Sequence, residues 1–158
     1  MDVRIGFGYD SHQLIGGRDL VIGGVKIPHS KGMLAHSDGD VLIHALCDAL
    51  LGAAALKDIG THFPDTDNQY QNIDSKILLF ETISLIQREG WHVNNADTTV
   101  VIETPKIAPY IDKVVANLSS LLQISSTALS IKAKTNEKLG FVGREEGVAA
   151  YAVVTLVR

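Results

Sequence analysis

The sequence is poor in the residues that mark several whole classes of protein. Among its 158 residues there is one cysteine, Cys47, and aromatic residues make up 6%. A lone cysteine cannot form an internal disulfide, which excludes a disulfide-stabilised scaffold and favours a reducing compartment. Repeats and low-complexity segments are also missing, so a solenoid or a compositionally biased linker is not expected.

The chain also lacks a strong charge of one sign and a long apolar run. Its net charge is -4, with 20% charged and 46% apolar residues. This balance excludes disorder and a general polyanion-binding surface, so no nucleic-acid partner is expected and any phosphate binding must be local. Because no apolar leader or membrane-length run is present, we expect a cytoplasmic protein without a membrane partner. The length predicts one domain over residues 1–158.

The most informative stretch runs from Met33 to Asp67 and surrounds one apolar helix. Apolar residues repeat with helical spacing from Val41 to Ala53, after capping oxygens at Ser37, Asp38 and Asp40. Asp40, His44 and Asp48 are spaced four apart and form one polar row. For the two aspartates a solvated helix face is the simpler interpretation, and for His44 it is a satisfied, half-buried histidine. The polar loop that follows, with glycines and a proline, indicates a rigid binding surface.

The remaining elements alternate between strands and helices. The patterns predict a strand over 3–12, a glycine-turned hairpin within 14–28, a connector over 29–32, a helix from Ser75 to about Glu89, a strand over 91–103, a helix opened by Thr104 and Pro105, a strand over 129–135, a glycine-bearing loop and a closing strand over 148–157. Short connections favour an α/β (α+β) fold with a ferredoxin-like mixed sheet and helices on one face. Since the strands carry many apolar residues, the other face is expected to be buried by partner subunits.

Two groups of residues carry candidate chemistry. Asp10 and His12 leave the same face of the first strand, and with His44 they offer the three ligands and one open position of a catalytic zinc site. Cys47 is rejected as a fourth ligand because its place in the apolar pattern points into the core. An exposed strand end with incidental polarity remains the alternative.

The second group lies in the loop over 132–144. Thr135, Glu137 and Arg144 provide a hydroxyl, a hard carboxylate ligand and a bidentate cation, a combination suited to phosphate with magnesium. A solvated loop is the alternative interpretation.

Taken in order, five segments resemble one known family over essentially the whole chain. They are GYDSH, AHSDGDVLIHALCDALLGA, DIG, FPDTD and TNEKLGFVGREEG. They resemble the 2-C-methyl-D-erythritol 2,4-cyclodiphosphate synthases of the non-mevalonate isoprenoid pathway. AHSDGD together with DIG and FPDTD is highly specific, whereas the isolated DxH is not.

The resemblance implies roles for individual residues. Asp10, His12 and His44 match zinc ligands, with one Zn2+ per subunit, and Glu137 matches the ligand of a Mg2+ or Mn2+ ion on the substrate diphosphate. His36 and Thr135 match the residues that position and polarise the phosphates. The implied substrate contacts are Asp10, Ser11, His12, His36, Ser37, Asp58, Ile59, Gly60, Phe63, Pro64, Asp65, Thr66 and Asp67 on the sugar side, and Ile102, Glu103, Thr104, Pro105, Lys106, Ile107, Ala108, Lys134, Thr135, Asn136, Glu137, Phe141 and Arg144 on the cytidine and phosphate side.

The same resemblance implies a homotrimer with active sites between subunits and a substrate linked to cytidine diphosphate. The implied reaction converts 4-diphosphocytidyl-2-C-methyl-D-erythritol 2-phosphate to 2-C-methyl-D-erythritol 2,4-cyclodiphosphate with release of CMP, which makes the enzyme a cyclising phosphorus-oxygen lyase. Two alternatives share the same residues: a zinc phosphodiesterase, and a non-catalytic trimer that binds nucleotides or isoprenoid diphosphates.

Overall fold

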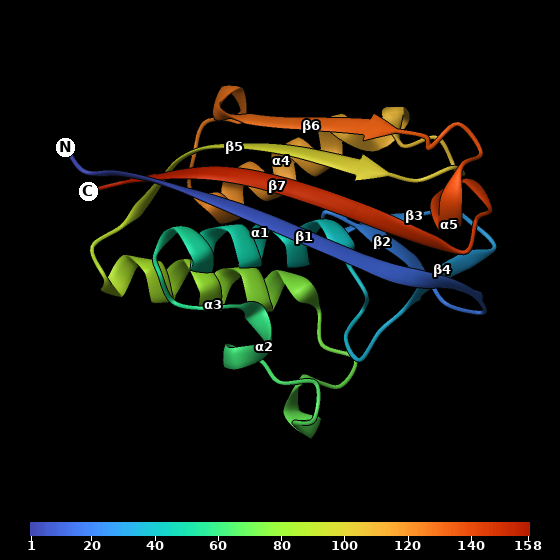
Figure 1. Cartoon of the computed structure of the whole chain (residues 1–158), viewed down its shortest axis with the longest axis horizontal. Coiled ribbons are helices and arrows are strands. Elements are labelled where there is room, and N and C mark those ends of the chain that lie inside the picture. Colours follow the sequence, from blue (N-terminus) through green and yellow to red (C-terminus); the bar gives the residue numbers. More distant parts are fainter.

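A five-stranded mixed sheet forms the centre of the computed structural model, which describes residues 1–158 (Figure 1). Its strand order is β4-β1-β7-β5-β6, and only β5 and β6 run parallel. The strands are β1 Val3–Gly16, β4 Lys31–Leu34, β5 His92–Val101, β6 Leu129–Lys134 and β7 Gly147–Val157, and a separate hairpin joins β2 Leu20–Ile22 to β3 Val25–Ile27. The predicted mixed sheet and the glycine-turned hairpin are both confirmed.

The main helices pack on one face of this sheet. The helices are α1 Val41–Ala53, α2 Ile59–His62, α3 Ser75–Arg88, α4 Ile111–Leu122 and α5 Gly140–Gly143, with 3-10 turns η1 Asn68–Tyr70, η2 Ala108–Tyr110 and η3 Ser126–Ala128. Helix α1 contacts β1 and β7 on one side and α3 on the other, and most of its side chains are buried. None of the helices is long and apolar enough to cross a membrane.

Two glycines let α1 lie unusually close to β1. A Cβ atom at Gly6 would lie 1.8 Å from the carbonyl oxygen of Ala49, and one at Gly8 would lie 1.9 Å from that of Ala45. No side chain fits in these positions, so the inner face of β1 meets the helix backbone directly. The Gly6-x-Gly8 pattern therefore has a packing role.

Asp40 connects the start of α1 to the β2–β3 hairpin. It is the N-cap of α1 and its side chain is fully buried, so the interpretation as a solvated face was wrong for this residue. Its carboxylate accepts hydrogen bonds from the amides of Gly23 at 2.9 Å, Gly24 at 2.6 Å and Ile43 at 3.1 Å. Burial raises the pKa of Asp40 to about 6, although these amides favour its charged form.

The sheet face away from the helices is apolar and exposed. Outward residues of β1 include Ile5, which is 72% exposed, and Phe7, which is 63% exposed. Val3, Tyr9, Tyr151 and Val153 extend the same exposed apolar surface. The expectation of helices on one face only is thus confirmed.

Several predicted boundaries differ from the structure. The third long helix begins at Ile111 rather than at Thr104 and Pro105, and Pro109 lies in the 3-10 turn just before it. Strand β1 extends to Gly16, and Lys31 and Gly32, predicted as a connector, pair with it in β4. The loop before β7 contains the short helix α5. The sequence did not predict it, because glycines stand at both of its ends.

We predict that Gly8→Ala destabilises the fold by about 1–3 kcal/mol or more, because the new methyl group would overlap the Ala45 carbonyl. Gly52→Ala is the matched control, since Gly52 lies in α1 with open space around its Cβ position, and alanine there should stabilise by about 0.5–1 kcal/mol. Urea denaturation of both variants measures the difference. Equal unfolding free energies would contradict the packing role of Gly8.

Candidate metal centre and substrate cavity

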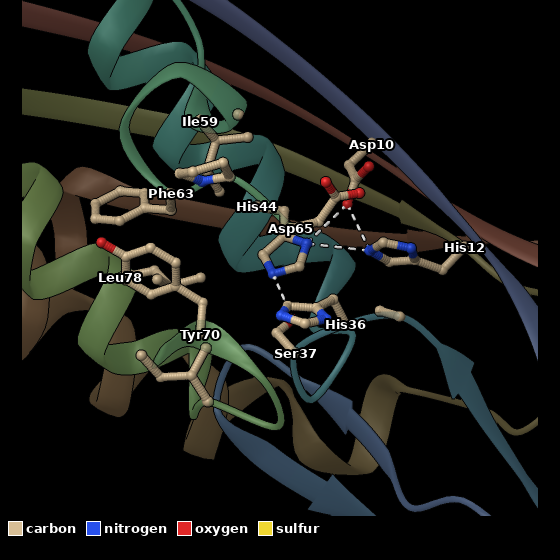
Figure 2. Close-up of a pocket in the computed structure, with 14 residues that line it drawn as sticks. Asp10, His12, His36, Ser37, His44, Ile59, Phe63, Asp65, Tyr70 and Leu78 are labelled. Carbon is tan, nitrogen blue, oxygen red and sulfur yellow. Dashed lines mark hydrogen bonds and ion pairs between the residues drawn. The ribbon is translucent and has the colours of Figure 1, made fainter. Parts of the chain in front are cut away.

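Asp10, His12 and His44 converge on one point between β1 and α1 (Figure 2). Asp10 Oδ2 lies 2.8 Å from His12 Nε2 and 3.1 Å from His44 Nδ1, and the two ring nitrogens are 3.0 Å apart. Side chains alternate between the two faces of β1, so Asp10 and His12 lie on the same inner face, as the sequence predicted. The structure therefore contains a potential metal-binding site made of one carboxylate and two imidazoles.

The donor set fits a tetrahedral metal ion. Ligands at the usual zinc distances of about 2.0–2.2 Å lie about 3.3–3.6 Å apart on a tetrahedron. The three donors here are 2.8–3.1 Å apart, so they need to move outward by only a few tenths of an ångström. Cys47 is fully buried in the core, which confirms its exclusion as a fourth ligand.

The Asp10 carboxylate gives the site a negative charge that suits a cation. Burial opposes ionisation of Asp10, but hydrogen bonds with His12 and His44 outweigh it and lower the pKa of Asp10 to about 2. Burial also disfavours the charged form of His44, but the hydrogen bond to Asp10 outweighs this effect and raises the pKa of His44. A negative carboxylate therefore faces the point where the imidazoles meet.

A cavity of about 480 Å³ opens directly beside this triad (Figure 2). One wall is the loop before α1, and the opposite wall is formed by α2 and the segment that follows it. The lining residues are Asp10, His12, Ala35, His36, Ser37, His44, Ile59, Gly60, Phe63, Pro64, Asp65, Tyr70, Ile73 and Leu78. His36 Nε2 lies 3.2 Å from the carbonyl oxygen of Asp67, which joins the two walls.

Most sugar-side residues expected from the resemblance line this cavity, but four do not. Ser11 lines a separate, second cavity instead. Asp58 caps α2 by accepting from the amide of Thr61, and Asp67 caps η1 by accepting from the amide of Gln69. Thr66 is exposed and is also outside the lining. Asp58 and Asp67 therefore shape the cavity wall through the backbone that they cap, without lining the cavity themselves.

The polar row along α1 has three separate uses. Asp40 caps the helix, His44 joins the triad, and Asp48 accepts a 2.7 Å hydrogen bond from the amide of Ile59. The last contact fixes the start of α2, which carries Ile59 and Gly60 into the cavity wall. Half-buried Asp48 is thus a structural anchor rather than part of a solvated face.

The second predicted group lies apart from the cavity. None of residues 102–108 or 134–137 lines it. Glu103 organises this region, because its carboxylate accepts from the amides of Asn136 at 3.1 Å and Lys138 at 3.3 Å. Thr135 Oγ1 lies 3.3 Å from Glu137 Oε1, so the two residues with predicted phosphate roles are neighbours.

Phe141 and Arg144 occupy the end of the molecule near α5. Phe141 lines a second cavity of about 440 Å³ that shares His12 with the first, together with Ser11, Gln13, Glu146 and Gly147. Arg144 is exposed and forms an ion pair with Glu146 at 2.8 Å. This pair holds the guanidinium beside the second cavity without lining it.

Sequence reasoning missed four residues that line the main cavity. Ala35, Tyr70, Ile73 and Leu78 supply much of its apolar wall. Leu78 was expected only as a helix residue facing the core. Tyr70 and Ile73 stand in an otherwise polar segment, and these two apolar residues were the available signal.

The comparisons with known proteins agree with this geometry. The model of the YgbB family matches residues 3–157. A curated relative from Cellvibrio japonicus, named 2-C-methyl-D-erythritol 2,4-cyclodiphosphate synthase, is 56% identical over 156 residues, covering 99% of this chain and 98% of the relative. A relative of the same name from Syntrophomonas wolfei is 55% identical over 154 residues, with 98% of each chain covered.

A solved structure of 2C-methyl-D-erythritol-2,4-cyclodiphosphate synthase in a CDP-bound form has the same fold. Its TM-score is 0.90 at 40% sequence identity, covering 98% of this chain and 100% of that one. The chain therefore belongs to the YgbB family, together with these 2-C-methyl-D-erythritol 2,4-cyclodiphosphate synthases.

Proposed function

We propose that residues 1–158 act as one catalytic domain that converts 4-diphosphocytidyl-2-C-methyl-D-erythritol 2-phosphate to 2-C-methyl-D-erythritol 2,4-cyclodiphosphate and CMP. The enzyme is a cyclising lyase of non-mevalonate isoprenoid synthesis. The observation that carries this proposal is a three-donor metal site opening into a cavity of about 480 Å³ whose walls hold the sugar-side residues of the family motifs. The lone, buried Cys47 supports a cytoplasmic location.

Asp10, His12 and His44 would hold one Zn2+ per subunit, and Glu137 would hold a Mg2+ or Mn2+ ion with the substrate diphosphate. Bound there, the two cations supply Lewis acidity at phosphate oxygens and neutralise charge on the diphosphate. The donor types support this assignment, since two imidazoles with a carboxylate suit zinc and an exposed carboxylate suits magnesium or manganese.

The reaction is an intramolecular transfer in which an oxygen of the 2-phosphate forms a bond to the β-phosphorus. The bond between that phosphorus and the oxygen bridging to the α-phosphate breaks, and CMP leaves with the electron pair. No protein nucleophile is required. The chain's task is to fold the substrate so that oxygen and phosphorus meet in line, and such orientation contributes about 7–11 kcal/mol in well-ordered intramolecular reactions.

Individual side chains divide this task. His36 and Thr135 position the phosphates by hydrogen bonding, and Ser37 with the segment over 63–67 grips the methylerythritol. The backbone over 102–108, with Lys106, receives the cytidine. The proximity of Thr135 to Glu137 supports a shared phosphate site for these two residues.

We infer that the complete active site needs two subunits of a homotrimer. In one chain the residues over 102–108 and 134–137 are separate from the cavity at the triad. The exposed apolar sheet face containing Ile5, Phe7 and Tyr151 is suited to burial against other copies. One subunit then provides the zinc and sugar side, and its neighbour provides the cytidine side.

Phosphorus NMR tests the reaction itself. Purified protein with the cytidylated substrate and magnesium should produce CMP and a cyclic diphosphate in equal amounts, and a zinc chelator should stop the reaction. Linear hydrolysis products would identify a zinc phosphodiesterase instead. If the metal-loaded trimer showed no turnover, the remaining interpretation would be a non-catalytic binding protein.

His44→Ala should lose stoichiometric zinc and turnover, because it removes one of three metal ligands from the centre of the site. His92→Ala is the control, since His92 is exposed at the start of β5 and belongs to no donor cluster. Zinc content after dialysis and initial rates measure both effects. Retained zinc and turnover in His44→Ala would refute the triad as the metal site.

Mixed trimers test whether the active site is shared. Trimers made only of His44→Ala chains, or only of Thr135→Ala chains, should be nearly inactive. Refolding the two variants together should restore activity in about a quarter of the sites, because one interface orientation then has both native residues. Mixtures no more active than the separate variants would place both residues in one subunit's site.

A further inference from the structure

His44 uses its two ring nitrogens on opposite sides. Nδ1 faces the triad, 3.1 Å from Asp10 Oδ2 and 3.0 Å from His12 Nε2. Nε2 faces away from it, 2.9 Å from Ser75 Oγ and 3.2 Å from Ser37 Oγ. A histidine ligates a metal through a bare nitrogen, so metal binding at Nδ1 requires the proton to be on Nε2.

Ser75 is placed to receive that proton's hydrogen bond. It is the first residue of α3 and is fully buried. Its hydroxyl donates a short hydrogen bond to Asp38 Oδ1, and its amide donates to Asp38 Oδ2 at 3.0 Å. An ionised carboxylate only accepts hydrogen bonds, so Asp38 takes the single hydroxyl proton of Ser75.

The proton count then determines which atom donates in the contact between His44 and Ser75. Because the Ser75 proton is directed to Asp38, Ser75 Oγ has only lone pairs to offer His44. It accepts from Nε2–H, so Nδ1, which faces Asp10 and His12, is the nitrogen left for a metal ion to bind. Asp38 is itself held by the amide of Asp40 at 3.1 Å, so this orientation is built into the start of α1.

We propose that Ser75 and Asp38 are positioning residues, which act through a hydrogen-bond relay to fix the His44 ring and its protonation for metal binding. The inference rests on the proposed metal function of the triad. It extends the site to two residues that touch neither the metal nor the point where the donors meet. Hydrogen-bond partners of metal-bound histidines typically contribute about 10–100-fold in metal affinity.

Ser75→Ala tests the relay by removing only the hydroxyl. In the assembled protein, competition with a chromophoric chelator should show zinc bound about 10–100-fold more weakly. Asp38→Asn should weaken binding less, because the Ser75 hydroxyl remains but loses its charged acceptor. Asp74→Asn is the matched control: Asp74 caps the same helix through the amide of Lys76 and has no contact with His44, so its zinc affinity should stay at the native value.

Proton NMR of the zinc-loaded, histidine-labelled protein gives a second measurement that a general loss of stability would not reproduce. The His44 Nε2–H signal should be protected from exchange in the native protein and in Asp74→Asn, and should exchange rapidly in Ser75→Ala. Native zinc affinity and native protection in Ser75→Ala would overturn the relay while leaving the metal site intact. A native protein that binds no zinc at the triad would instead overturn the proposed metal function, and the relay with it.

Discussion

The close approach of α1 to β1 is the contact on which the site depends. At Gly6 and Gly8 the helix carbonyls lie where a side chain would begin, so any larger residue forces the two elements apart. His44 belongs to the same helix, and Asp10 and His12 follow Gly8 on the same inner face of the strand. The packing that buries the core therefore also sets the spacing of the three donors. A displacement of α1 by the width of a methyl group would exceed the few tenths of an ångström that a metal ion tolerates.

Asp40 fixes the other end of this arrangement. Its buried carboxylate joins α1 to the turn between β2 and β3 through Gly23 and Gly24. The cost of burial is visible in a pKa raised to about 6, and three amide donors offset part of it. Hydrophobic packing allows a helix to slide, whereas directed hydrogen bonds to one carboxylate define its axial position. Together the glycines set the separation between α1 and β1, and Asp40 sets the position of α1 relative to the β2–β3 turn.

Much of the fold could be predicted from the sequence, because hydrophobic periodicity and helix capping depend on residues that are close together in the chain. The inward pair Asp10 and His12 and the helical position of His44 follow directly from strand and helix periodicity. The predictions that failed depend on contacts between residues that are far apart in the sequence. The exposure of Asp40 could not be judged without the hairpin that covers it. The start of α4 was predicted too early, at Thr104 and Pro105, because a proline suits the first turn of a helix. Tyr70 and Leu78 meet in one cavity wall only after α3 folds back beside α1.

The metal centre and the cavity wall share a backbone connection, which couples their geometry. The loop before α1 is joined to the segment before α3 by the amide of Asn72 donating to the His36 carbonyl at 2.7 Å and the amide of Asp38 donating to the Ile73 carbonyl at 3.1 Å. Ser75 extends the same connection to His44. One pair of segments thus orients a metal ligand and also presents His36 and Ile73 to the cavity. For a reaction that depends on placing two ends of one substrate in line, this coupling is an advantage, because the position of the metal site cannot drift independently of the pocket that holds the sugar.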